Sequence, residues 1–140
     1  MKEKKLGNNS FLIRLDKGDE IIESLTNFSR ANKLGFASVS GIGAASRAVI
    51  SVFNMQEKRY IEQGFEGNLE IVSLLGNVTM ADGIPRIHLH AAITGDDLNV
   101  HGGHLVSATV SVTCEIVLDV SKTSIKRSRD EVTRLMLISD

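Results

Sequence analysis

The chain has few of the residues that mark several large classes of protein. Its 140 residues include one cysteine, one proline and no tryptophan, and aromatic residues make up 4%. A single cysteine, Cys114, cannot form an internal disulfide. With so few aromatic side chains, the sequence offers no stacking platform for single-stranded nucleic acid. No apolar run approaches the roughly 20 residues that a membrane span needs, so we expect no membrane partner.

The charge balance is nearly even. Sixteen lysines and arginines stand against 17 acidic residues, which gives a formal net charge of −1 and a pI of about 6.4. The isolated chain therefore has no overall positive field, which argues against strong general DNA binding. The N-terminal residues 1–5 are charged and no hydrophobic signal core follows them, so we expect a cytoplasmic location.

Length and composition predict one folded domain over residues 1–140. Hydrophobic residues make up 42% of the chain, enough for a substantial core. Residues 1–8 are polar and are expected to be loose, and residues 121–140 form a tail of mixed character.

Alternating apolar residues and turn residues predict a chain built mainly of strands. One amphipathic helix is expected from its N-cap Asp19 to about Lys33, with Gly35 ending it. Turns are expected at 41–43, where the chain bends, and at 66–68, as a hairpin. The expected strands are 10–15, 36–42, 44–54, 59–65, 69–80, 85–94, 98–101 and 110–120. The prediction is an α+β fold with a mainly antiparallel sheet, and one helix cannot cover so wide a sheet, so we expect a homo-oligomer.

The strand 110–120 has the clearest alternation in the chain. One apolar face is predicted to contain Val110, Val112, Cys114, Ile116, Leu118 and Val120. A thiol on such a face is expected to be buried and inert, so Cys114 receives no catalytic role.

All four histidines lie within residues 88–104: His88, His90, His101 and His104. Period-two alternation places His88 and His90 on one face of a strand, and Gly102 and Gly103 allow His104 to return toward them. Neutral imidazoles are good ligands for divalent transition metals, so the cluster predicts a metal site. His88 and His90 are the firmest candidates and His104 comes next. His101 is an alternative ligand or a group beside the ligands, and a polar network or an anion site stays open as an alternative.

A short basic run lies in the tail at Lys122, Lys126, Arg127 and Arg129. Such a run is compatible with a solvated surface or with a patch that binds DNA phosphates.

Several segments together resemble one known family, the plant-and-prokaryote-conserved (PPC) domain. In chain order they are Arg14, the helix after Gly18-Asp19-Glu20, Ser40-Gly41-Ile42-Gly43-Ala44, Leu69-Glu70-Ile71-Val72-Ser73-Leu74, His88-Leu89-His90, Gly102-Gly103-His104-Leu105 and Glu115-Ile116-Val117-Leu118. The resemblance covers roughly residues 9–120. It implies a mainly antiparallel α+β fold, a homotrimer and a metal cluster at His88, His90 and His104.

The same resemblance implies a DNA-binding or regulatory role. In plants the domain accompanies AT-hook motifs, and the single-domain prokaryotic members are described as candidate DNA-binding proteins. The Arg-Gly-Arg core of an AT-hook is absent from this sequence. The block Leu69–Leu74 resembles the segment that contacts partner proteins in plant members, although its pattern is also that of a core strand.

Three functions follow from these observations. The first is a DNA-binding or regulatory protein with a structural or regulatory metal, for which zinc is the expected ion, although nickel, cobalt and iron also accept imidazole. The second is a metal-dependent lyase resembling acetolactate decarboxylase, in which His101 would be a ligand and Arg14 and Glu115 would bind carboxylate and transfer protons. A plain salt bridge is the alternative for Arg14 and Glu115. The third is a trimeric scaffold held together by its histidines.

Overall fold

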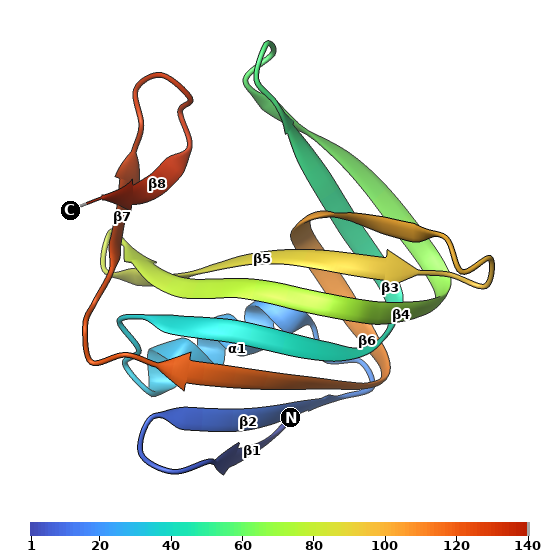
Figure 1. The fold of residues 1–140 in the computed structure, drawn as a ribbon, viewed down its shortest axis with the longest axis horizontal. Coiled ribbons are helices and arrows are strands. Elements are labelled where there is room, and N and C mark those ends of the chain that lie inside the picture. The colour runs from blue at the N-terminus through green and yellow to red at the C-terminus, as the bar shows by residue number, and fades with distance from the viewer. Residues whose placement is uncertain (140) are drawn as a thin grey trace.

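A computed structural model of the protein describes residues 1–139, and strands make up most of it (Figure 1). The elements are β1 (Lys2–Lys5), β2 (Ser10–Asp16), α1 (Ile21–Ala31), β3 (Ala37–Asn54), β4 (Arg59–Ala81), β5 (Ile84–Thr94), β6 (Val100–Val120), β7 (Lys126–Arg129) and β8 (Met136–Ser139). One helix beside a mainly antiparallel sheet confirms the predicted architecture.

The helix α1 covers one face of the sheet. Its apolar side chains Ile21, Leu25 and Phe28 recur at helical spacing and are buried in the core. The N-cap is Glu20 and not the expected Asp19. One carboxylate oxygen of Glu20 accepts from the backbone N–H of Glu23, and the other accepts from that of Ala108, which ties the helix to β6. The helix ends at Ala31, two residues before the expected end at Lys33.

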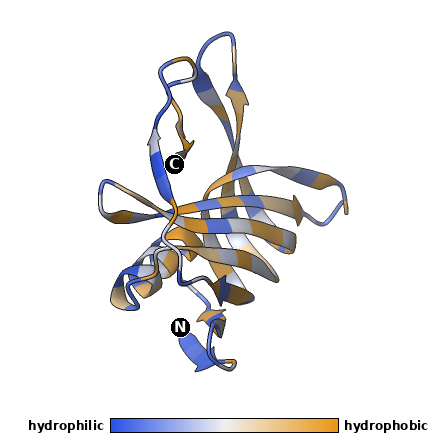
Figure 2. Cartoon of the chain, turned by 60° about the vertical axis from the view of Figure 1, so that its left-hand side comes forward, coloured by the Kyte–Doolittle hydropathy of each residue, from blue (hydrophilic) through white to orange (hydrophobic). Residues whose placement is uncertain are grey.

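Four strands close a circuit of hydrogen-bonded pairs. Strand β3 pairs with β4 and β6, and β5 also pairs with β4 and β6, all antiparallel. The outer half of β3 and the first half of β4 project from the body as an arm (Figure 1), and beyond Ser51 β3 pairs only with β4. Apolar and polar residues alternate along the central strands (Figure 2).

Three predicted interruptions are wrong. The gap expected between the strands 98–101 and 110–120 does not occur, because β6 runs continuously from Val100 to Val120 and no turn forms at Gly102 and Gly103. Residues 41–43 lie within the continuous strand β3, and residues 66–68 lie within β4, where no hairpin turn forms. Register shifts in the β3–β4 pairing occur at Gly41/Gly43 and Ala45/Arg47. These β-bulges let long strands bend without ending, so the glycines that suggested turns serve as bends inside strands.

The apolar face predicted for residues 110–120, which lie in β6, is correct except at Val112. In the antiparallel β3–β6 pairing, Cys114 lies opposite Gly43 and Val110 lies opposite Ala45, so β6 has more residues than β3 between these two pairs. This bulge changes the side to which Val112 points. Val112 is 71% exposed, whereas Cys114 is buried, which raises the pKa of its thiol to about 12. The thiol is therefore neutral at physiological pH, in keeping with an inert residue.

Both ends of the chain are more ordered than the sequence suggests. Within residues 1–8, expected to be loose, Lys2–Lys5 forms β1 against β2, and the ammonium group of Met1 lies 3.2 Å from Asp16 and 3.0 Å from Asp19. In the tail, β7 and β8 form a hairpin, and β7 contacts β4 at the pair Met80 and Lys126. No helix in residues 1–139 is both long and apolar enough to cross a membrane.

Candidate metal centre

Three of the four histidines meet where β5 lies against β6. His88 and His90 are two residues apart on β5, and Leu89 between them points into the core. His104 on β6 is the direct cross-strand partner of His90. The cross-strand partners of His90 and His88 on β4 are Leu75 and Asn77, neither of which is in the core that α1 covers.

The three imidazoles are close enough to share one ion. One ring nitrogen from each of His88, His90 and His104 lies within 4.8 Å of the others. The ring centroids are 5.2 Å apart for His88 and His104, 5.4 Å for His88 and His90, and 5.7 Å for His90 and His104. Three nitrogen donors around one point form the donor set of a catalytic-type zinc site, in which a fourth position stays open.

The electrostatics favour the neutral form of two of the rings, His88 and His104, and neutral imidazole is the form that binds metals. Burial, together with the positive charge of Arg127, lowers the pKa of His88 to about 4. Burial also lowers the pKa of His104. The Nδ1 atom of His104 is buried and has no hydrogen-bond partner within the described part of the chain. An ion between the rings would suit neutral donors and an unpaired nitrogen, so these residues fit a divalent metal.

Arg127 contacts the cluster from the C-terminal hairpin. Its guanidinium donates to Thr79 Oγ1 at 2.8 Å, to the Met136 carbonyl oxygen at 2.8 Å and to Asn77 Oδ1 at 3.1 Å, and it lies 3.2 Å from His88 Nδ1. A guanidinium only donates, so Nδ1 of His88 accepts and the ring proton sits on Nε2. An ion bound at Nδ1 would displace the guanidinium, and an ion bound at Nε2 would move the proton to face it. Metal binding by His88 therefore requires this one hydrogen bond to be released.

Glycines allow the strands around the cluster to approach closely. A Cβ on Gly103 would lie 2.7 Å from the Ser51 carbonyl oxygen, and a Cβ on Gly76 would collide with the carbonyl oxygen of His88. Larger residues at either position would push the neighbouring strands apart. The sequence predicted that Gly102 and Gly103 allow His104 to return toward the other histidines. The structure shows a further close approach at Gly76 on β4, next to His88.

The other histidine, His101, is not part of the cluster. Its ring packs on Phe65 with a centroid distance of 4.9 Å, and it lines a different cavity with Asp97. The sequence ranked His104 ahead of His101 but kept His101 as an alternative ligand, because both flank the same pair of glycines. The strand register separates them, since His101 pairs with Ile93 and His104 pairs with His90.

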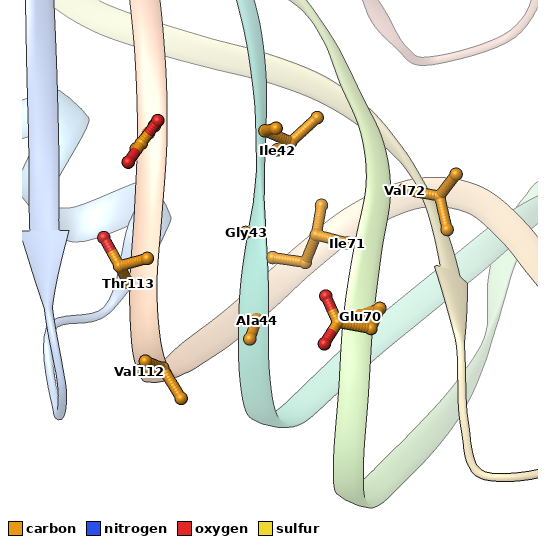
Figure 3. A pocket seen from close by; sticks show the side chains of 9 residues that line it. Ile42, Gly43, Ala44, Glu70, Ile71, Val72, Val112 and Thr113 are labelled. Atoms are coloured by element: carbon orange, nitrogen blue, oxygen red, sulfur yellow. The ribbon is translucent and has the colours of Figure 1, made fainter.

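The residues considered for proton transfer and carboxylate binding lie away from the cluster. Arg14 is exposed and donates to Asp16 Oδ1 at 3.1 and 2.8 Å. Glu115 is its cross-strand partner, yet it lines the open face of the sheet with Ile42 and Thr113 (Figure 3). The expected salt bridge between Arg14 and Glu115 does not occur, because Asp16 on the same strand takes the guanidinium.

The basic run of the tail is divided by the β7 strand. Lys122, Lys126 and Arg129 are exposed, whereas Arg127 is half-buried and turned toward His88. Period-two alternation points Arg127 inward, so its guanidinium contacts the protein more than the other three basic side chains do.

Sequence reasoning missed two neighbours of the cluster. Arg127 reaches His88 across 39 residues of chain, and Tyr60 stacks on the His104 ring with a centroid distance of 5.3 Å. Both contacts depend on the arm and the hairpin, which no local pattern reveals.

Fold and cluster together define a small, mainly antiparallel α+β protein with a three-histidine site of metal-binding type. Residues 2–122 match the Plants and Prokaryotes Conserved (PCC) domain, and the chain belongs to this family. No curated protein sequence shows significant similarity to the chain.

Solved structures agree with this assignment. A candidate DNA-binding protein from Bacteroides thetaiotaomicron has a TM-score of 0.94 at 27% identity, with 99% of this chain and 96% of that chain covered. A metal-containing protein from Archaeoglobus fulgidus has a TM-score of 0.87 at 35% identity, with 100% of each chain covered. Acetolactate decarboxylase from Bacillus subtilis has a TM-score of 0.60 at 18% identity, with 81% of this chain and 53% of that chain covered. The last comparison shows a shared fold only.

Proposed function

We propose that the protein is a metal-binding regulatory protein that associates with DNA, and that His88, His90 and His104 hold its ion. The observation that carries the metal site is the convergence of three ring nitrogens within 4.8 Å. The similarity to the metal-containing protein from Archaeoglobus fulgidus supports it. We propose zinc as the ion, because zinc binds imidazole nitrogen readily and forms sites with only three protein ligands.

A calorimetric titration of metal-free protein tests this site. Zinc is expected to bind the wild type with one ion per chain, and the variant His90→Ala is expected to lose at least tenfold in affinity because one of three donors is removed. The matched control is His101→Ala, which removes an imidazole outside the cluster and should bind as the wild type does. Parallel titrations with nickel and cobalt rank the metals. Equal zinc binding by both variants would refute the assignment.

The DNA-associated role is supported by the family and by the description of the Bacteroides thetaiotaomicron protein. The exposed side chains of Lys122, Lys126 and Arg129 are the phosphate contacts that we propose. A trimer would present three copies of this patch, so DNA would meet local positive charge although each chain keeps its net charge of −1.

Fluorescence anisotropy with a labelled DNA duplex tests the role. Counterion release predicts that affinity falls steeply between about 50 and 200 mM salt. The variant Lys122→Ala/Lys126→Ala should bind DNA more weakly, and its affinity should depend less steeply on salt. The control Lys4→Ala/Lys5→Ala removes the same charge from β1 and should bind DNA as the wild type does. A flat salt response or no binding at low salt would contradict DNA association and leave the metal site standing.

We also propose that the protein assembles as a homotrimer. The face of the sheet opposite α1 carries exposed apolar side chains, including Ile42, Val72 and Val112, which are 59%, 53% and 71% exposed (Figure 3). These residues line a cavity of about 510 Å³ on this face. Contiguous apolar surface of this kind marks an interaction site, and copies of the same chain would cover it.

A further inference from the structure

A second cavity lies beside the histidine cluster, under the C-terminal hairpin. Its volume is about 440 Å³, within the range of small-molecule sites. Strands β4, β5 and β6 contribute Tyr60, Arg86, His88 and His104 to its wall, and the hairpin contributes Arg127 and the segment 134–137. The cavity therefore exists only because the hairpin stands against the body of the protein.

The charge of the wall is positive. Three arginines line the cavity, Arg86, Arg127 and Arg134, and none of the lining residues within 1–139 is acidic. None of the three guanidinium groups forms an ion pair with another described residue. Guanidinium groups recognise carboxylates and phosphates through paired hydrogen bonds, so the cavity is suited to an anion.

The rest of the wall is apolar and includes Ile87, Leu135 and Leu137. Inorganic anions gain nothing from such side chains, whereas an organic anion can bury its carbon skeleton against them. The polar groups then fix the orientation of the ligand and the apolar groups supply contact area.

We propose that this cavity binds a small organic carboxylate, held by Arg86 and Arg134 and packed on the apolar side chains of the hairpin. Arg127 contributes positive charge to the wall, because most of its N–H groups already donate within the protein. Two rings of the cluster, His88 and His104, belong to the same wall, so the ligand lies beside the metal site. The carboxylate site depends on the arginines and not on a bound ion. It can therefore hold or fail independently of the proposed metal function.

The test measures the thermal stability of metal-free protein with benzoate and hexanoate as probes. A bound carboxylate stabilises the folded state, and at ten times its Kd the melting temperature should rise by about 3–5 °C. Benzamide, which has the shape of benzoate without its charge, should produce no rise. The probes are used at about 10 mM, which is ten times the Kd of a weakly bound ligand of about 1 mM. No rise with either carboxylate at this concentration would overturn the proposal. An equal rise with benzamide would also overturn it.

Variants locate the site. Arg86→Ala/Arg134→Ala should abolish the rise, and the matched control Arg30→Ala/Arg129→Ala, which removes two arginines outside the cavity, should keep it. An equal loss in the control would show a general charge effect and overturn the site. A rise with inorganic phosphate as large as that with benzoate would refute an organic ligand.

A second measurement needs no variant. In NMR spectra of methyl-labelled protein, benzoate should shift the methyl signals of Leu135 and Leu137. Shifts confined to the open face, at Ile42 and Val72, would place the ligand elsewhere and overturn the proposal. The metal titration described above is made without carboxylate, so its result does not affect this one.

Discussion

At the scale of single residues, burial and one arginine decide the state of the histidine cluster. Burial is the larger cause of the lowered pKa of His88, and Arg127 adds to it. The sequence predicted which three histidines come together, because His88 and His90 alternate on a strand and His104 follows a pair of glycines. It could not place Arg127 beside His88, because the basic run that contains Arg127 reaches the cluster only through the folded hairpin.

The lowered pKa of His88 predicts a pH-dependent stability of the metal-free protein. Between about pH 6.5 and pH 4 the unfolded chain binds more protons at this residue than the folded chain does. The free energy of unfolding should therefore fall as the pH falls through this window. Denaturant unfolding of wild type and His88→Gln measures it, and the variant should show a shallower fall. The control His101→Gln should follow the wild type, and an identical slope for His88→Gln would contradict the effect.

Arg127 is predicted to oppose metal binding at His88. Arg127→Ala removes the hydrogen bond that occupies His88 Nδ1 and also removes a positive charge near the ion. One hydrogen bond of about 1 kcal/mol corresponds to roughly fivefold in affinity, so zinc should bind several-fold more tightly. Competition with a zinc-sensitive dye measures the change. Arg129→Ala should leave the affinity unaltered, and weaker zinc binding by Arg127→Ala would show that Arg127 supports the site instead.

At the scale of elements, bulges and close approaches shape the site. The existence of most strands could be predicted from alternation, and so could the helix. The continuity of β3 and β4 could not, because a glycine-rich bend inside a strand and a turn between strands look alike in sequence. The reversal of Val112 has the same origin, since a bulge is set by pairing with a distant strand.

Gly103→Ala is predicted to damage both the packing and the cluster. The added methyl group would lie 2.7 Å from the Ser51 carbonyl oxygen and 2.9 Å from Ile50 Cγ2, so β3 and β6 would move apart next to His104. Forcing strands apart in this way costs about 1–3 kcal/mol. Chemical denaturation measures the loss, and zinc titration should show weaker binding. Gly64→Ala meets no neighbour within 4 Å and is the matched control. Equal stability of the two variants would contradict this account.

At the scale of the whole molecule, the face of the sheet opposite α1 exposes apolar side chains that the proposed homotrimer would cover. Subunit packing was expected because one helix covers only one face, and the structure shows which apolar residues the other face exposes. The number of subunits comes from the family resemblance and not from any local pattern.

Val112→Asp is predicted to break the assembly, because it would bury three unpaired charges in a trimer. Light scattering should give three times the chain mass of 15.2 kDa for the wild type and a much lower mass for the variant. Val132→Asp places the same charge on an exposed residue near the hairpin turn and should stay trimeric. A wild-type mass equal to one chain would refute the trimer.

The central functional claim is that the histidine cluster binds a metal ion. Elemental analysis of purified protein after extensive dialysis tests it most directly. The account predicts one divalent ion per chain in the wild type and in His101→Ala, and almost none in His88→Ala/His104→Ala. A wild type without a stoichiometric ion, or a double variant that retains one, would contradict it.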